Sequence, residues 1–123
     1  MEYIVVKLND LRFLVDFSEI SEIIPNNINI TSMPLSSKFQ KGIILYRDKV
    51  ISLMDSKLLL DMDLTPYDRK SVILVLNIEE NLVGFLVDEA MSILKSDSEE
   101  QIVEQDGINH QKLNLKILIG NCV

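Results

Sequence analysis

The sequence predicts a mostly β protein that contains only short helices. Short apolar runs rich in valine, isoleucine and leucine recur along the chain, and polar turns separate them. Helical spacing of apolar residues, by contrast, lasts for only a turn or two wherever it appears. We expect about eight strands in two groups built from hairpins, and regularly spaced strands of this kind favour a barrel or a sandwich.

The length and composition indicate one globular domain with an acidic surface. The chain has 123 residues, of which 47% are apolar and 25% charged, and its formal net charge is −7. This balance argues against binding to a nucleic-acid backbone, because that mode of binding needs clustered lysine and arginine. The longest unbroken apolar run, residues 72–76, is too short for a membrane-spanning helix. Because the N-terminus also lacks a basic leader, we expect a cytoplasmic protein.

Residues 41–55 form the element around which the other segments are arranged. Two apolar strands, 43–46 and 50–54, flank the polar turn 47–49, and Gly42 stands at the entrance. A lone hairpin is marginally stable, so the segments before and after it must cover its apolar face. The turn stays in water, where an arginine offers a planar fork of donors that suits a carboxylate of a partner.

The rest of the first half should contain short elements only. In chain order we expect a hairpin of strands 3–8 and 12–17 with a turn at 9–10, a short helix over 18–24 ended by Pro25, a weak strand over 26–33, a turn over 36–41, and a short helix capped by Asp55 and Ser56. The helix at 18–24 is predicted because Ile20, Ile23 and Ile24 have helical spacing behind a serine cap. The polar segment 63–70 lacks periodicity, which indicates a loop that joins two halves, 1–62 and 63–123.

The second half should open with another hairpin. Residues 71–77 show no alternation, which predicts a strand buried on both faces, and 82–88 return as its partner after a turn at 79–81. Gly84 lies inside that second strand, where a glycine marks a bulge or a close approach by another backbone. Further on we expect a strand or short helix around Met91, Ile93 and Leu94, an exposed acidic loop over 96–109, and a last strand in 111–123 from the alternating Leu113, Leu115, Ile117 and Ile119.

The residue types that catalysis or metal binding requires are sparse. Cys122 is the only cysteine, and His110, the only histidine, lies in a polar stretch and is expected to be solvated. The sequence has no glycine-rich phosphate loop and no nucleophile motif. Asp16, Asp55 and Asp88 each end an apolar run, where an aspartate usually caps the following turn. We therefore expect no enzyme activity, no metal and no cofactor, which leaves binding to another protein.

Several segments, taken in order, resemble the CheW-like domain family of bacterial chemotaxis. The resemblance runs from about Tyr3 to Val103. It is carried by Ile20-Ser21-Glu22-Ile23-Ile24-Pro25, Ile30-Thr31-Ser32-Met33-Pro34, Lys41-Gly42-Ile43-Ile44-Leu45-Tyr46-Arg47 with Val50-Ile51 and Asp55, and Val83-Gly84-Phe85-Leu86-Val87-Asp88. Each segment alone is weak, whereas their order and spacing together are fairly specific.

The resemblance implies one CheW-like domain over 1–123, with two SH3-like, five-stranded barrels and no catalytic activity. Family members couple the cytoplasmic tips of chemoreceptors to the histidine kinase CheA, whose regulatory domain has the same fold. The receptor tip is expected to dock in a groove between the barrels. The residues that line or support this groove by position are Ile20, Glu22 and Ile23 on the short helix, Lys41, Gly42 and Arg47 on the central hairpin, and Val83, Gly84 and Asp88 on the later hairpin. Arg47 is the candidate for pairing with receptor acids.

The chain departs from the family pattern in two places. Asp48 stands where the family has a glycine, so we expect an internal ion pair with Arg47 that competes with the partner. The C-terminal part is shorter than usual, which predicts an incomplete second barrel with an open edge. An open edge favours an alternative in which a divergent module forms a homodimer or binds another signalling regulator outside the receptor array.

A third reading, a small-ligand or hydrolytic barrel, requires a pocket with convergent polar groups.

Overall fold

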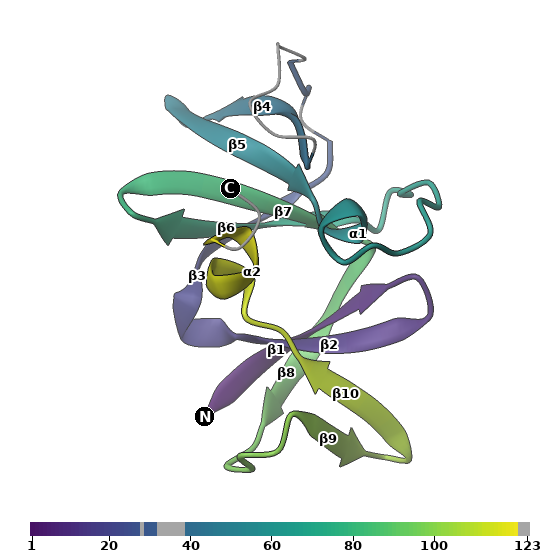
Figure 1. The fold of residues 1–123 in the computed structure, drawn as a ribbon. Coiled ribbons are helices and arrows are strands. Elements are labelled where there is room, and N and C mark those ends of the chain that lie inside the picture. Colours follow the sequence, from purple (N-terminus) through teal and green to yellow (C-terminus); the bar gives the residue numbers. More distant parts are fainter. Residues whose placement is uncertain (28, 32–38, 121–123) are drawn as a thin grey trace.

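The protein consists of two five-stranded β-sheets and a few short helices, as a computed structural model that describes residues 1–27, 29–31 and 39–120 shows (Figure 1). The first sheet has the order β8 (Glu89–Lys95), β1 (Glu2–Leu8), β2 (Leu11–Asp16), β10 (Ile108–Lys112) and β9 (Ile102–Gln105). The second has the order β3 (Ile20–Pro25), β6 (Val72–Ile78), β7 (Asn81–Val87), β5 (Lys49–Asp55) and β4 (Gln40–Tyr46). The helices are η1 (Phe17–Glu19), α1 (Ser56–Leu59) and α2 (Leu115–Gly120). The mostly β class is confirmed.

Tight turns set the register of the predicted hairpins. In β4–β5 the turn residues Arg47 and Asp48 have φ angles of 50° and 63°, and in β6–β7 Glu79 and Glu80 have φ angles of 51° and 68°. Two consecutive positive φ angles are typical of a type I′ turn, whose twist matches that of the flanking strands. The opening hairpin β1–β2 is also present, and it turns at Asn9.

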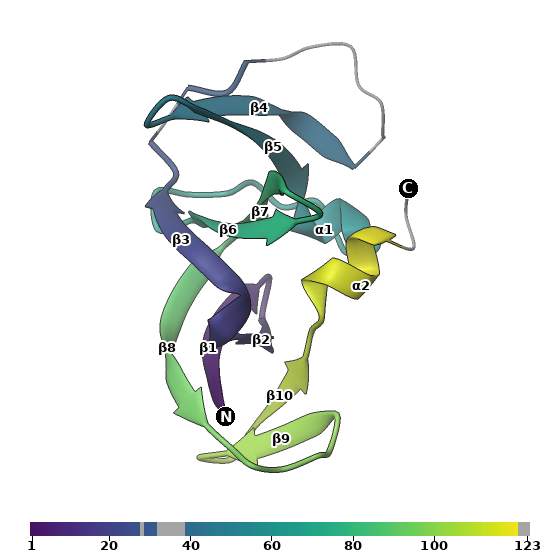
Figure 2. The ribbon, with the colours of Figure 1, turned by 90° about the vertical axis from the view of Figure 1, so that its left-hand side faces the viewer.

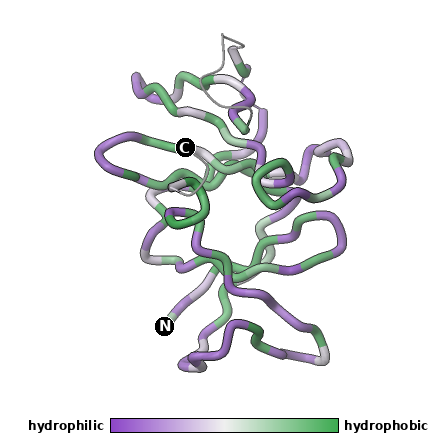
Figure 3. Tube along the Cα trace, in the orientation of Figure 1, coloured by the Kyte–Doolittle hydropathy of each residue, from purple (hydrophilic) through white to green (hydrophobic). Residues whose placement is uncertain are grey.

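Alternation along the strands sends side chains into different apolar clusters. In β6, Leu74 and Leu76 point into a core shared by the two sheets, while Ile73 and Val75 point into a core enclosed by the second sheet. This explains why β6 is apolar at every position from Val72 to Leu76, as expected for a strand buried on both faces. The shared core contains Ile4, Val6, Leu8, Phe13 and Val15 from the first sheet, Met54, Leu74, Leu76, Val83, Phe85 and Val87 from the second, and Leu59, Leu115 and Ile119 from α1 and α2. Green, apolar stretches of the chain meet there from both sheets (Figure 3).

The two sheets do not divide the chain at 62/63. The second sheet uses the continuous segment 20–87, and the first combines the strands before it with those after it. The chain passes between sheets at η1 and again at Asp88, between β7 and β8 (Figure 2). The segment 63–70 is a loop, as predicted, but it connects α1 to β6 within the second sheet. The expected halves 1–62 and 63–123 therefore do not correspond to the sheets.

The predicted helix over 18–24 is wrong. Only η1 is helical there, and Ile20 to Pro25 form β3, which pairs with β6 and has a register shift between Ile20 and Glu22. A short sequence of β-branched residues fits the apolar spacing of a helix as well as that of a strand. Pairing with a neighbouring strand that has free hydrogen-bonding groups then favours the strand.

The predictions for the C-terminal part also need correction. The acidic segment contains β9 and the first two residues of β10, and the expected final strand is instead the end of β10 followed by α2. His110 is 4% exposed, and its Nδ1 lies 3.0 Å from the carbonyl oxygen of Ile108. Its position on β10, between β2 and β9, buries a side chain that the polar sequence suggested was solvated.

The segment expected to be a weak strand at 26–33 lies partly outside the described residues. Thr31 forms a single bridge with Ile43 on the free side of β4, with N···O distances of 2.9 and 3.0 Å. Residues 36–38 of the turn expected at 36–41 are also outside the described residues, and Gln40 and Lys41 belong to β4. By the strand pairings of the described residues, β3 and β4 are the edges of the second sheet, and β8 and β9 those of the first.

Candidate docking face

An ion pair links the turn of the central hairpin to β3. Arg47 Nη1 lies 3.0 Å from Glu22 Oε1, and the guanidinium carbon lies 5.0 Å from the centre of the Tyr46 ring. The Arg47 side chain is 71% exposed. The ion pair that the structure gives Arg47 is thus with Glu22 and not, as expected, with Asp48. The ion pair and the ring hold Arg47 in place while its outer side remains open to a partner.

Exposed apolar side chains lie on the strands that adjoin this ion pair. Leu45 and Val50, which lie opposite each other in the β4–β5 register, are 68% and 58% exposed, and Ile23 on β3 is 37% exposed. A hollow beside the pair is lined by residues of all five strands of the second sheet: Ser21, Glu22, Tyr46, Lys49, Ile51, Val75 and Leu82, together with Arg47. We call the group Glu22, Ile23, Leu45, Arg47 and Val50 the docking face. Exposed apolar side chains together with an arginine are typical of protein interfaces.

Four predicted site residues have packing roles. Val83 and Gly84 are buried in β7, and a Cβ atom on Gly84 would lie 2.7 Å from Cγ2 of Ile73. Gly84 therefore permits close side-chain packing inside the second sheet, whereas the sequence suggested an approach by another backbone. Ile20 packs against the shared core. At Gly42, with φ of 154°, a Cβ atom would lie 2.5 Å from the carbonyl oxygen of Thr31, so only glycine fits beside that bridge.

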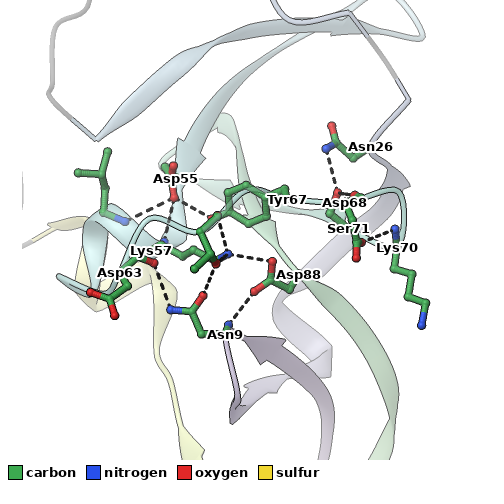
Figure 4. Close-up of polar contacts among 12 residues, drawn as sticks. Asn9, Asn26, Asp55, Lys57, Asp63, Tyr67, Asp68, Lys70, Ser71 and Asp88 are labelled. Carbon is green, nitrogen blue, oxygen red and sulfur yellow. Dashed lines mark hydrogen bonds and ion pairs between the residues drawn. The ribbon is translucent and has the colours of Figure 1, made fainter.

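Asp88 belongs to a polar cluster where the two sheets meet (Figure 4). Lys41 lies at the edge of this cluster, beside Asp55. At the centre of the cluster is Lys57, which is completely buried and donates to Asp88 Oδ1 at 2.9 Å and to Thr65 Oγ1 at 2.8 Å. The other oxygen of Asp88 accepts from the backbone N–H of Asn9 at 2.7 Å. The cluster thus connects α1, the passage between sheets at Asp88, and the turn of the β1–β2 hairpin.

Asp55 and Tyr67 complete the polar cluster. Asp55 accepts the backbone N–H groups of Lys57 and Leu58, which confirms its predicted capping of α1. It also accepts the Tyr67 hydroxyl at 2.7 Å, and Lys41 Nζ lies 3.9 Å from its other oxygen. Burial, followed by the hydrogen bond and the charge of Asp55, raises the pKa of Tyr67 far above its ordinary value.

The structure thus separates the nine predicted site residues into three groups: the docking face, the packing residues and the polar cluster. Sequence reasoning missed Lys57, Thr65, Tyr67 and Asn9, because a lysine on a short helix and polar residues in loops are ordinarily solvated. One signal was available: Lys57 follows Asp55 closely in an apolar segment, where a charged side chain needs a partner.

The space between the sheets is filled by the apolar shared core. A packed interior argues against the small-ligand or hydrolytic reading, which needs a pocket with convergent polar groups. Over residues 1–27, 29–31 and 39–120, no cluster of three or more side chains suitable for a metal ion is found. Within the same ranges, no helix is long and apolar enough to cross a membrane.

Comparison with known proteins identifies the family. The family model for the CheW-like domain matches residues 2–113, which is most of the chain. The chain belongs to the CheW-like domain family. The fold of this CheW-like domain is similar to the crystal structure of the scaffolding protein TtCheW from Thermoanaerobacter tengcongensis, with a TM-score of 0.85 and 21% identity over 95% of this chain and 86% of the other. At that identity the likeness concerns the fold, and it agrees with the class read from the sequence.

Family membership supports a scaffold role in chemotaxis for this CheW-like domain, because CheW-like domains are non-catalytic scaffold proteins. The match ends at residue 113, just before α2.

Proposed function

We propose that this CheW-like domain is a non-catalytic adaptor that couples the cytoplasmic tip of a chemoreceptor to the regulatory domain of the histidine kinase CheA. The family match over residues 2–113 is the observation that carries this proposal. We interpret the two curled sheets as the two SH3-like barrels of the family fold. The role places the chain at the cytoplasmic side of membrane receptors.

The docking face is the surface we assign to the receptor contact. Arg47 offers a planar, permanently charged group to receptor carboxylates, and Ile23, Leu45 and Val50 offer exposed apolar area on the adjoining strands. Because Glu22 already holds the guanidinium, the side chain loses little further conformational entropy on binding. Ile20, Gly42, Val83 and Gly84 support this face through packing, and Lys41 and Asp88 support it through the polar cluster.

The test is binding of the purified chain to a receptor tip fragment and, separately, to the CheA regulatory domain of its own organism, measured by calorimetry. We expect both to bind and Arg47→Glu to weaken the receptor contact several-fold. Arg69→Glu is the matched control, since it makes the same charge change on an exposed loop residue away from the docking face. Receptor binding that is unchanged in Arg47→Glu would reject the docking face, and a wild-type chain that binds neither partner would reject the adaptor role.

A charge swap distinguishes a contact role from a structural one. The double variant Glu22→Arg with Arg47→Glu keeps an ion pair but exchanges its two charges. If Arg47 contacts receptor carboxylates, the double variant stays weak. If the ion pair only shapes the turn, the double variant recovers receptor binding.

The open edges of the first sheet favour a second candidate, a divergent module that forms a homodimer or binds another regulator. Strands β8 and β9 are the edges of that sheet, and Ile93 and Ile102 on them are 44% and 56% exposed. Exposed edges with apolar side chains readily accept another chain. Sedimentation velocity on the isolated chain discriminates: a stable dimer at micromolar concentration favours this candidate, and a monomer favours the adaptor.

A further inference from the structure

The loop 63–70 lies as an exposed strap over a buried lysine, and we call this loop the strap (Figure 4). Leu64 in the strap is 61% exposed, whereas Lys57 beneath the strap is completely buried. Lys57 Nζ donates to the carbonyl oxygen of Thr65 at 3.0 Å and to its hydroxyl oxygen at 2.8 Å. The centre of the Tyr67 ring lies 4.2 Å from the same ammonium. The strap therefore shields the charge of Lys57 from water.

Side-chain contacts hold the strap in place. Within the described part of the chain, residues 63–67 make no backbone-to-backbone hydrogen bond. Their anchors include the bonds from Lys57 and the Tyr67 hydroxyl, which donates to Asp55 at 2.7 Å. An exposed segment with so few backbone bonds opens at a lower free energy than the sheets do. Opening also lets water solvate the Lys57 ammonium, which offsets part of the cost of the lost bonds.

Four residues close a ring of hydrogen bonds, and the strap supplies one of them. Lys57 Nζ donates to Asp88 Oδ1 at 2.9 Å and to Thr65 Oγ1 at 2.8 Å. Asp88 Oδ2 accepts the backbone N–H of Asn9 at 2.7 Å. The Thr65 hydroxyl closes the ring by donating to Asn9 Oδ1 at 2.6 Å. The ring thus joins α1, which directly follows β5 of the second sheet, to the β1–β2 turn of the first sheet.

Asn9 is the residue through which the strap reaches the first sheet. Among the described residues, the hydrogen bonds between the strap and the β1–β2 turn are those of the Asn9 side chain with Thr65 and with the carbonyl oxygen of Asp63. A hollow of about 320 Å³ lies beside these bonds, and its lining includes Thr65 and, from the first sheet, Lys7 and Glu89. The lining contains no side chain of the shared core, so the strap has room to move without disturbing that core.

We propose that the strap is a latch between the two sheets, which opens locally while both sheets stay folded and then frees the β1–β2 turn to move relative to the second sheet. Asp88 supports this role, because it is both a member of the ring and the point where the chain passes from β7 to β8. A contact on the exposed strap is thereby transmitted through Asn9 to the first sheet. The physical link is a ring of side chains with a closed and an open arrangement.

Hydrogen exchange in the isolated chain tests the latch on both sides of the ring. The readouts are the ammonium protons of Lys57 and the backbone N–H of Asn9, followed by NMR. Thr65→Val removes the hydroxyl that joins these groups and keeps the shape of the side chain, so we expect both to exchange about tenfold faster. Amides of β6 and β7 should keep their wild-type rates. Thr31→Val is the matched control and should behave like wild type, because the chain's other threonine is exposed and bonds to Ile43 through its backbone.

A second variant breaks the ring from the first sheet. Asn9→Gly removes the side chain that accepts from Thr65, while glycine tolerates the φ angle of 54° at this position. We expect the Lys57 ammonium to exchange several-fold faster in this variant, although the hydrogen bonds of Asn9 are with other members of the ring and the strap. Asn9→Gly also keeps the test valid if Thr65→Val fails to fold by circular dichroism.

Three results of the exchange experiment would overturn the proposal. Faster exchange at Lys57 alone in Thr65→Val would mean that the strap covers the lysine without coupling it to the turn. An equal acceleration in β6 and β7 would mean a general loss of stability in place of a local opening. Unchanged exchange of Lys57 in both variants would mean that the ring does not hold the strap.

The movement of the turn is measured as the distance between two spin labels. The labels are attached at Leu11→Cys, beside the turn, and at Asn77→Cys on β6, both exposed positions, with the native Cys122 replaced by serine. We expect one narrow distance distribution when the latch is intact and a broader one with Thr65→Val. Equal widths would overturn the proposed freeing of the turn. Because all these measurements use the isolated chain, their outcome does not depend on whether it couples a receptor to a kinase.

Discussion

Glu22 on β3 and Arg47 after β4 come from opposite edges of the second sheet, yet their charged groups are 3.0 Å apart. The sheet must therefore curl until its two edges approach each other. Thr31, in the segment that follows β3, also bonds to Ile43 on β4. An ion pair and one bridge thus join edges that no continuous strand ladder connects within the described residues.

This ion pair should matter more for binding than for stability. Because the Arg47 side chain is 71% exposed, we expect Arg47→Ala to lower the free energy of unfolding by less than about 1 kcal/mol. Urea denaturation measures this, with Arg69→Ala as the control for removal of an exposed arginine. A loss well above that size would mean that the pair holds the sheet edges together.

The buried pair of Lys57 and Asp88, by contrast, should contribute strongly to the stability of the fold. Asp88→Ala leaves the completely buried Lys57 ammonium without its carboxylate, and we expect a loss of about 3–5 kcal/mol in the free energy of unfolding. Lys57→Met should cost less, because Asp88 is partly exposed and keeps the Asn9 N–H as a partner. Urea unfolding of both variants and the double variant gives the coupling energy. Equal and small losses in the two single variants would contradict the assignment of the pair as buried and charged.

Glycine should stabilise the type I′ turns. Asp48 and Glu80 occupy the second turn position with φ angles of 63° and 68°, where an L side chain is strained. We expect Asp48→Gly to raise the free energy of unfolding by up to about 1 kcal/mol, and Glu80→Gly to raise it more, because aspartate tolerates this conformation better than glutamate. Thermal unfolding of the two variants measures the difference. A decrease in both would show that the entropy cost of glycine outweighs the strain.

Alkaline stability should depend on Tyr67. Its pKa is raised by burial, then by the hydrogen bond and charge of Asp55, so the folded state holds the hydroxyl proton more tightly than the unfolded chain does. The stabilisation is complete below the ordinary tyrosine pKa of about 10 and is lost as pH rises above it toward the folded value. We expect Tyr67→Phe to flatten the loss of stability above that pH. Urea unfolding from neutral to alkaline pH checks this, and an identical slope in both proteins would contradict it.

The sequence by itself determined the hairpins and the burial of the central strands. Alternation and turn residues are local properties, so β1–β2, β4–β5 and β6–β7 follow from the residues within each segment. The apolar run in β6, which does not alternate with polar residues, likewise required other segments to bury both faces of the strand. The family resemblance added the docking candidates, and the family match confirms the resemblance itself.

Only the tertiary structure decided between helix and strand in segments whose local sequence pattern fits both. Ile20 to Pro25 became β3 because β6 offers a free edge, and the end of the chain became α2 because the shared core accepts Leu115 and Ile119 on one helix face. The burial of Lys57 and His110 could not be predicted from the local sequence either. Their hydrogen-bond partners lie in other segments or are positioned by strand pairing. Local propensities differ by little, whereas contacts between distant segments contribute more free energy, so those contacts determine the outcome.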